Sequence, residues 1–327
     1  MNQGVVKKLF SKVKRFLPLI GLTLLIYTVY TLDISRIIKA FLSIPPIYIV
    51  LALPLTLPRI LIRNTAWILI QREQRIKLSF CESLRIYLIG YFYGSFTPGY
   101  LGQLMRILYM KEETGEPYGK LFVNSFIEAT VHTFSLYVMM LIGSLLVVDA
   151  FPTLPIIISA WIIFIVLFII YFINKERGEK IFTLLVSKML PSKIRFHGHQ
   201  FTSTFYKDFP RIKKLITPLL LGSLTWIIIF TQEYMIVLAL KLPIPYPFFL
   251  LLFPVANAAG FIPISFAGLG TREFTAVMLF STFFNTPGEE IFVVSLLGFV
   301  ITDVFTGFIG FLCALISGKP IKKSLPS

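Results

Sequence analysis

Long runs of apolar residues, separated by short polar connections, fill most of this 327-residue chain. A run of about 20 apolar residues is long enough to cross the hydrocarbon core of a bilayer as a helix. The pattern predicts about six full membrane spans, over residues 16–32, 45–70, 121–148, 154–173, 215–240 and 291–316. Pro54 and Pro58 fall inside the second span and predict a kink there. We therefore expect an all-α polytopic membrane protein.

Two further apolar blocks, residues 84–110 and 246–284, are interrupted by proline, glycine and arginine. The interruptions carry Pro98, Gly102 and Arg106 in the first block and Pro263, Gly268, Gly270, Arg272 and Glu273 in the second. Lipid cannot satisfy the backbone groups that such residues release, so these breaks persist only where protein or water covers them. One break in each half of the chain is typical of a transporter binding site. Each block is predicted to be a re-entrant helical hairpin.

Basic residues give the predicted orientation, because Lys and Arg concentrate in cytoplasmic connections. They are abundant near both termini and in residues 71–85 and 174–214, whereas residues 149–153 and 285–290 have none. We expect a multi-pass protein of the cell membrane with cytoplasmic N- and C-termini. With these sides assigned, the first hairpin enters from the cytoplasm and the second from outside. Two hairpins of opposite orientation indicate an inverted repeat.

The predicted organisation is a single transmembrane domain over residues 1–327. Its first half, 1–173, and its second half, 215–327, are joined by the basic connection 174–214. For that connection, a basic amphipathic helix on the membrane surface and a solvated loop both remain open.

Composition agrees with a membrane protein and argues against other classes. The chain is 56% hydrophobic and 14% charged, whereas soluble domains carry about 25% charged residues. The net charge of +15 lies beside apolar runs and not on an independent domain, so no nucleic-acid partner is expected. Cys81 and Cys313 are far apart and form no Cys/His cluster, so no metal or cofactor is expected. The sequence lacks the HExxH, GxSxG and Walker A motifs, so we expect a transporter and not an enzyme.

Ionisable side chains inside apolar runs are costly and are therefore functional candidates by default. The basic ones are Arg59, Arg63, Arg106 and Arg272, and the acidic ones are Glu128, Glu233, Glu273 and Asp303. Arg59 is expected near the middle of the bilayer, whereas Arg63 lies close enough to the cytoplasmic end to reach the interface. Mutual pairing of these charges is a structural alternative to function.

Arg106 and Arg272 each follow a glycine-rich break that would start a half-helix. The free N–H groups and positive dipole of such a helix end attract an anion, and a guanidinium adds bidentate donors that match phosphate. The predicted substrate-binding residues are Arg106, Arg272, Glu273, Arg59, Gly102, Gly268 and Gly270. The alternative is that the glycines permit tight hairpin packing while the arginines pair with Glu128 or Glu273.

A second group of residues could couple transport to protons or only pair charges. Glu128 and His132 are four residues apart on one helix face, and Asp303, flanked by Thr302 and Thr306, is the analogue of Glu128 in the second half. Glu233 is expected about two turns from the outer end of its span. The predicted coupling or charge-pairing residues are Glu128, His132, Glu233 and Asp303.

Over nearly its whole length the chain resembles the transmembrane, flippase-like region of lysylphosphatidylglycerol synthase, a family of stand-alone prokaryotic membrane proteins. The resemblance rests on residues 63–67, 98–106 and 263–273. It implies an all-helical fold with re-entrant hairpins and a role in lipid translocation. The sequence departs from the family where Glu128 is followed by Ala129 and Thr130 instead of arginine, and where the last span offers Asp303. The aminoacylating synthase domain is absent, so lysine transfer is not implied.

Three functions remain open. The first is a lipid translocase that moves an anionic phospholipid or polyprenyl-phosphate-linked lipid through a polar cavity between the hairpins. The second is a secondary transporter of a small anionic solute, and the third is an intramembrane lipid-modifying enzyme. Membrane lipids are the expected partners, and a homodimer is left open.

Overall fold

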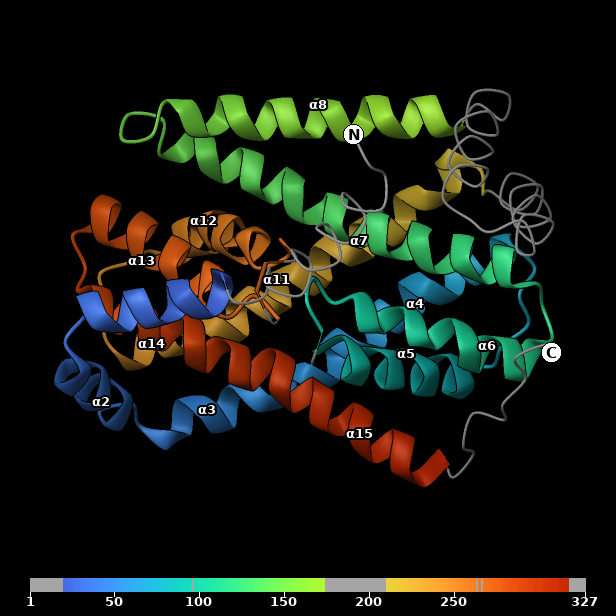
Figure 1. Ribbon diagram of the computed structural model, residues 1–327, viewed down its shortest axis with the longest axis horizontal. Coiled ribbons are helices and arrows are strands. Elements are labelled where there is room, and N and C mark those ends of the chain that lie inside the picture. The colour runs from blue at the N-terminus through green and yellow to red at the C-terminus, as the bar shows by residue number, and fades with distance from the viewer. Residues whose placement is uncertain (1–19, 96, 174–209, 263, 266, 318–327) are drawn as a thin grey trace, which may run out of the picture. The chain divides into compact units, whose positions relative to one another are not determined.

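The computed structural model describes residues 20–95, 97–173, 210–262, 264–265 and 267–317, and every regular element in these ranges is a helix (Figure 1). Residues 174–209 of the basic connection, for which an amphipathic helix and a solvated loop were both open, and the two chain ends lie outside the described residues. The chain divides into two compact units. Unit 1 comprises residues 1–60, 87–103 and 226–318, and unit 2 comprises residues 61–86, 104–225 and 319–327. Each unit draws on both predicted halves, whose boundaries stay a prediction.

Four described helices are long and apolar enough to cross a membrane. They are Pro46–Glu73, Tyr118–Leu146, Ile212–Ala239 and Gly288–Ile316. A fifth candidate is the bent pair formed by Ile20–Thr31 and α2 (Ile34–Leu42), which meet at 90°. The four long helices coincide with four of the predicted spans, which confirms a polytopic membrane protein. The full number of spans stays a prediction.

The second predicted span is interrupted at a proline. It consists of α3 (Pro46–Ala52), a single 3-10 turn (Leu53–Leu55) and α4 (Thr56–Glu73), with Pro54 inside the turn. Proline lacks an N–H and its ring clashes with the preceding turn, so the α-helical hydrogen bonding stops there. The helix is therefore irregular at Pro54, and the predicted kink stays a prediction.

In unit 1, α13 (Thr271–Phe284) packs against α12 (Tyr246–Ala259) and α14 (Gly288–Phe299) (Figure 1). Phenylalanines fill the space between α12 and α13. Phe249 stacks on Phe253 with ring centroids 4.7 Å apart, and Phe280 approaches Phe249 to 5.6 Å. All three rings are fully buried, so this aromatic core fixes the two helices against each other.

The last span of unit 1 changes its helical type at its centre. A π-helical turn, Val300–Val304, separates α14 from α15 (Phe305–Ser317). Single π-turns inside α-helices are rare and occur frequently at functional sites.

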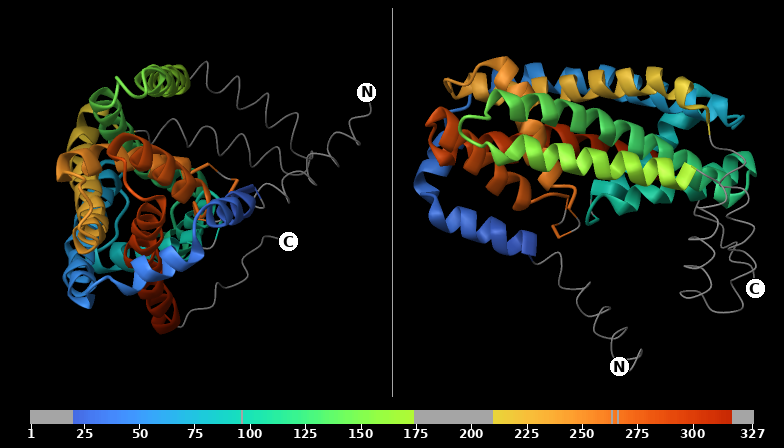
Figure 2. Two further views of the ribbon diagram at one scale, coloured as in Figure 1. Left: turned by 90° about the vertical axis from the view of Figure 1, so that its left-hand side faces the viewer. Right: turned by 90° about the horizontal axis from the view of Figure 1, so that it is seen from above.

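In unit 2, α7 (Tyr118–Leu146) and α8 (Thr153–Ile173) lie side by side and are joined by a short turn (Figure 2). Val123, Ile127 and Val131 of α7 form a buried core with Ile70 of α4. The Ser135 hydroxyl of α7 donates to the backbone oxygen of Leu219 at 2.9 Å and so ties in α11 (Ile216–Ala239).

Both broken blocks form helical hairpins. In the first, α5 (Phe80–Ser95) and α6 (Arg106–Thr114) flank the break and the 3-10 turn Leu101–Met105. Arg85 at the start of α5 pairs with Glu113 near the end of α6 at 2.7 Å, so the two outer ends return to one place.

The second hairpin closes in the same way. The Phe248 ring, at the start of α12, lies 5.8 Å from the Phe284 ring at the end of α13. Both helices have 14 residues and are thus about 21 Å long, shorter than the roughly 30 Å hydrocarbon core. Neither arm alone would cross a bilayer.

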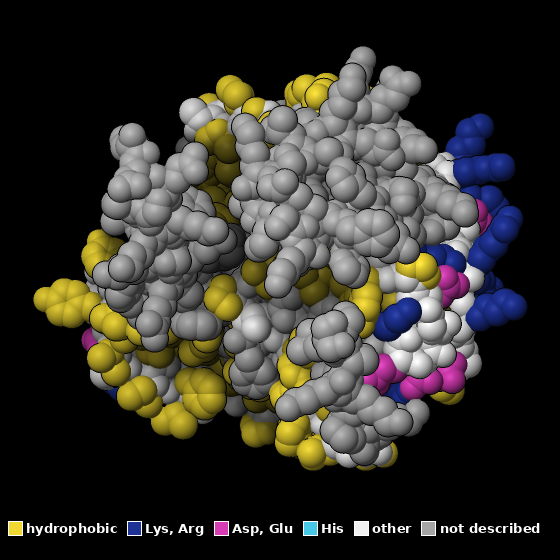
Figure 3. Space-filling model, turned by 45° about the vertical axis from the view of Figure 1, so that its right-hand side comes forward, with side chains coloured by type: hydrophobic (Ala, Val, Ile, Leu, Met, Phe, Trp, Pro, Cys, Tyr) yellow, Lys and Arg dark blue, Asp and Glu magenta, His cyan; other side chains and the backbone are white. Residues whose placement is uncertain are grey.

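Basic connections meet at one end of unit 2. Lys214, in the 3-10 turn Ile212–Leu215, pairs with Glu73 at the end of α4 at 3.5 Å. Arg72, Arg75 and Lys77 are exposed nearby in sequence. Figure 3 shows Lys and Arg side chains gathered along one edge of the face in view. Connections that were predicted to share one side of the membrane therefore lie together.

Candidate functional site

Glycine and glutamate define the start of α13. Gly270 has a φ of +92°, and a Cβ at this position would strike the backbone oxygen of Gly21. Glu273 accepts a hydrogen bond from the Gly270 N–H through Oε2 at 2.6 Å, which is the carboxylate half of a capping box. This local geometry places Arg272 in the first turn of the helix, facing the protein interior.

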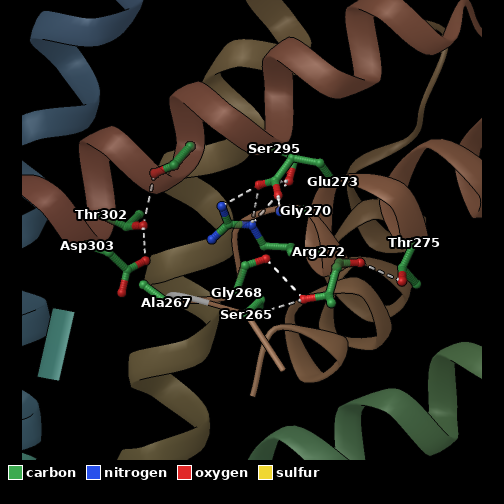
Figure 4. A network of polar contacts seen from close by, with 12 residues as sticks. Ser265, Ala267, Gly268, Gly270, Arg272, Glu273, Thr275, Ser295, Thr302 and Asp303 are labelled. Carbon is green, nitrogen blue, oxygen red and sulfur yellow. Dashed lines mark hydrogen bonds and ion pairs between the residues drawn. The ribbon is translucent and has the colours of Figure 1, made fainter. Parts of the chain in front are cut away.

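Arg272 is buried, and three neighbouring side chains contact its guanidinium. Its terminal nitrogen donates to Glu273 Oε1 at 2.5 Å, and its Nε donates to the Ser295 hydroxyl at 3.2 Å (Figure 4). The guanidinium carbon also lies 4.6 Å from the centroid of the Phe299 ring. Breaking a buried pair by removing one partner is strongly unfavourable. An anion bound at Arg272 would compete with Glu273 for the guanidinium.

The π-turn of the last span organises a second polar cluster in unit 1. Arg59 of α4 donates to the backbone oxygen of Thr302 at 2.9 Å and to the hydroxyl of Thr306. Among the described residues no carboxylate pairs with Arg59, although its side chain is only 4% exposed. The hydrogen bonds that the structure describes for its guanidinium go to a backbone oxygen and a hydroxyl.

Asp303, within the π-turn, accepts hydrogen bonds from two tyrosines of the first broken block. The Tyr91 hydroxyl lies 2.6 Å from Oδ1, and the Tyr100 hydroxyl lies 3.1 Å from the same oxygen. Thr302 donates to Oδ2 at 3.0 Å. Asp303 is thus stabilised by neutral donors.

The breaks of the two hairpins meet in unit 1. Tyr100 belongs to the first break, and its hydroxyl lies 3.4 Å from the backbone oxygen of Ala267 in the second. The Tyr100 ring also contacts the Phe261 ring edge-on at 5.9 Å. The irregular backbone of both blocks is therefore covered by protein near Asp303, as a break at membrane depth requires.

Glu233 of α11 is buried in the same unit. Its side chain is 1% exposed and lies against Gly298 of α14, where an added Cβ would be 2.8 Å from Glu233 Cγ. Among the described residues, no hydrogen bond or ion pair engages its Oε2 atom. The neighbouring Gln232, by contrast, donates to the backbone oxygen of Ala52 and to Thr56.

Unit 2 holds a separate cluster in which two arginines share one carboxylate. Glu128 of α7 pairs with Arg63 of α4 at 2.9 Å and with Arg106 of α6 at 2.7 Å. Arg106 also donates to the backbone oxygen of Ser125 at 2.8 Å and lies over the Trp67 ring at 5.0 Å. All three charged side chains are buried. The cluster therefore has one more positive than negative charge.

The remaining predicted residues have mainly packing contacts. His132 is buried on α7, one turn after Glu128 and close to Gly222. Gly102 lies directly against the backbone oxygen of Tyr93, and Gly268 against Gly260. These contacts favour tight packing as the role of the glycines, and contact with substrate stays a prediction. In the part of the chain that the structure describes, no group of three His, Cys, Asp or Glu side chains could hold a metal ion.

Ion pairing, which the sequence left open, is present at both predicted arginines. Arg106 pairs with Glu128 and Arg272 pairs with Glu273. Arg63 was expected to reach the interface, but it is 9% exposed and bound to Glu128. Arg63 lies four residues after Arg59 and therefore on the same helix face, which was the available sequence signal that Arg63 is buried. The sequence contains no direct signal for Tyr91 or Tyr100, although Tyr100 lies in the first break.

The helical spans, the covered breaks and the buried charges define a multi-pass α-helical membrane protein. Residues 16–310 match the family described as the lysylphosphatidylglycerol synthase TM region, and the chain belongs to that family. The resemblance expected from the sequence is thereby confirmed over most of the chain.

Two relatives extend over similar lengths. The UPF0104 membrane protein MJ1595 of Methanocaldococcus jannaschii is 22% identical over 310 residues, which are 89% of this chain and 91% of the relative. The UPF0104 membrane protein PH1989 of Pyrococcus horikoshii is 24% identical over 289 residues, 82% and 86% of the two chains. No solved structure matches this chain.

Proposed function

We propose that this protein is a lipid translocase that moves an anionic phospholipid or a polyprenyl-phosphate-linked lipid across the membrane. The observation that carries this proposal is the Arg63–Glu128–Arg106 cluster, where two buried guanidiniums share one carboxylate. A guanidinium in a medium of low dielectric constant exerts a strong attraction on an anion. Guanidinium donors also match the oxygens of a phosphate in geometry.

A lipid substrate is favoured over a soluble anion by the family. The description of the family names a synthase of a phospholipid, and the region that residues 16–310 match is its TM region. We propose that the headgroup phosphate binds at Arg106 and Arg63 in unit 2. Arg272 offers a corresponding site in unit 1 when Glu273 exchanges for the phosphate.

We further propose that the hairpins are re-entrant, enter from opposite faces and belong to an inverted repeat with both termini in the cytoplasm. The contact of Tyr100 with Ala267 and Phe261 supports hairpin tips that meet inside the membrane. The Lys214–Glu73 pair supports a common side for the basic connections. An inverted repeat of this kind is the architecture that underlies alternating access.

The test uses purified protein in liposomes with a fluorescent anionic lipid. Arg63→Gln and Arg106→Gln each leave one arginine on Glu128, so the fold is retained while the excess positive charge is lost. We expect translocation to slow by roughly tenfold to a hundredfold, the equivalent of one charge-assisted hydrogen bond. Arg85→Gln, which breaks a partly exposed pair with Glu113, is the matched control and should transport like the wild type.

Translocation at the wild-type rate in both Arg63→Gln and Arg106→Gln would overturn this mechanism. Uptake of a soluble headgroup analogue without movement of the lipid would instead identify a small-solute transporter. Chemical conversion of the labelled lipid would identify a lipid-modifying enzyme.

A further inference from the structure

The charged groups clustered in unit 1 do not balance when every group is ionised. Two buried guanidiniums, Arg59 and Arg272, lie near the buried carboxyl groups of Glu233 and Glu273 and the half-buried Asp303, and all of these side chains belong to unit 1. One carboxyl group is therefore in excess. Unit 2 has the opposite imbalance, since Glu128 is shared by two arginines.

The contacts identify which carboxyl group is in excess. Glu273 receives hydrogen bonds from the Gly270 N–H, from Arg272 and from Ser295. Asp303 receives three from the hydroxyls of Tyr91, Tyr100 and Thr302. Such donors stabilise an anion inside a protein.

Glu233 receives no hydrogen bond from the described residues. The charged groups that act on it come from every element around it, namely Arg59 on α4, Arg272 and Glu273 on α13, and Asp303 in the π-turn. Tyr100 faces it from the first hairpin break. Terminal nitrogens of the two arginines donate to Thr302 and to Glu273, and no described residue donates to Glu233 Oε2. A buried carboxylate without a partner is so costly that it takes up a proton instead.

We propose that Glu233 is a proton-binding site and that its proton is coupled to movement of the anionic lipid, an inference that rests on the proposed function. The reaction is the exchange of one proton between water and the Glu233 carboxylate, and no other bond forms or breaks. A metal ion is disfavoured because the described residues offer no cluster of three His, Cys, Asp or Glu side chains.

The coupling follows from competition for the arginines of unit 1. With Glu233 protonated, the charges of this cluster cancel, and an incoming phosphate can exchange for Glu273 at Arg272. With Glu233 ionised, a third carboxylate competes for the same guanidiniums and opposes the phosphate. By thermodynamic linkage, the proton and the anion each strengthen the binding of the other. The lipid would accordingly move together with a proton.

The first measurement does not depend on transport. Infrared difference spectra of the purified protein in membranes, recorded across a pH titration, report the carbonyl stretch of a protonated carboxylic acid. We expect this band in the wild type, its loss in Glu233→Gln, and its retention in Glu112→Gln, an exposed glutamate of α6. A band that is absent from the wild type or unchanged in Glu233→Gln would overturn the inference.

The second measurement uses liposomes with an imposed proton gradient and the fluorescent anionic lipid. For one proton per lipid, a gradient of about one pH unit should shift the leaflet distribution by up to about tenfold in the wild type and in Glu112→Gln. Glu233→Gln, which imitates the protonated state, should still move lipid but should equilibrate the leaflets regardless of the gradient.

The two proposals fail in different ways. A gradient response retained in Glu233→Gln, or lacking in the wild type while lipid still moves, would overturn the coupling and leave the translocase intact. A complete lack of lipid movement by the wild type would overturn the translocase and the coupling together, while the infrared band would still decide whether Glu233 binds a proton.

Discussion

The buried arginines of this protein differ in how their charge is met. Arg272 has its own carboxylate, Glu273, together with a hydroxyl and an aromatic ring. Arg63 and Arg106 share Glu128, whereas the hydrogen bonds described for Arg59 go to a backbone oxygen and a hydroxyl. The Arg272–Glu273 pair is thus one-to-one, whereas two arginines share the carboxylate of Glu128.

The Arg272–Glu273 pair should dominate the stability of unit 1. Arg272→Gln alone leaves Glu273 buried and unpaired, and we expect a loss of about 3–5 kcal/mol in the free energy of unfolding. The double variant Arg272→Gln with Glu273→Gln should lose clearly less, because neither charge remains. A double-mutant cycle by thermal melting in detergent checks this. Additive losses in the cycle would contradict the pairing.

The sequence shows which charged side chains lie inside apolar runs, but it does not show which residues they pair with. Arg63 and Glu128 are 65 positions apart, and local spacing holds no information about a contact of that kind. Local spacing likewise gives no sign that the Tyr91 hydroxyl binds Asp303. Tertiary contacts between helices decide these roles.

At the scale of elements, the two hairpins could be predicted because proline and glycine mark the breaks directly. The π-turn Val300–Val304 could not, because the sequence VITDV contains neither residue and its apolar pattern suits an ordinary α-helix. Its stability comes from tertiary contacts, among them the Arg59 hydrogen bond to Thr302. The structure thus adds a site within a span that was predicted to be regular.

Gly270 should be irreplaceable for the second hairpin. Gly270→Ala combines a left-handed backbone with a clash against the Gly21 backbone, and we expect a loss of about 2–5 kcal/mol from strain and overpacking. Gly115, the C-cap of α6, also has a positive φ but has nothing within 4 Å of an added Cβ. Gly115→Ala should therefore cost only the strain of about 1–2 kcal/mol. Thermal melting compares the two, and equal losses would refute the packing role.

For the whole molecule, the orientation in the membrane rests on the distribution of charge. The basic connections at one end of unit 2 predict the cytoplasmic side, and the turn between α13 and α14 predicts the outside. The Asp33 N–H donates to Glu289 at 3.4 Å, so the turn after the first helix lies beside that predicted outer turn in unit 1.

Cysteine labelling tests this orientation. In a background with Cys81→Ser and Cys313→Ala, we expect Lys77→Cys and Lys213→Cys to react with an impermeant maleimide only after the membrane is permeabilised. Glu289→Cys and Lys241→Cys should react in intact cells. Labelling of all four positions from one side would rule out hairpins of opposite orientation.

The contact between Gly21 and the second hairpin also constrains biosynthesis. The Gly21 N–H donates to the backbone oxygen of Ile264 at 2.8 Å, yet Ile264 is made almost 250 residues later. A ribosome that adds about 5–20 residues per second needs roughly 10–50 s for this distance. The nascent N-terminal helix must therefore remain in the bilayer without its final neighbour until translation is nearly complete.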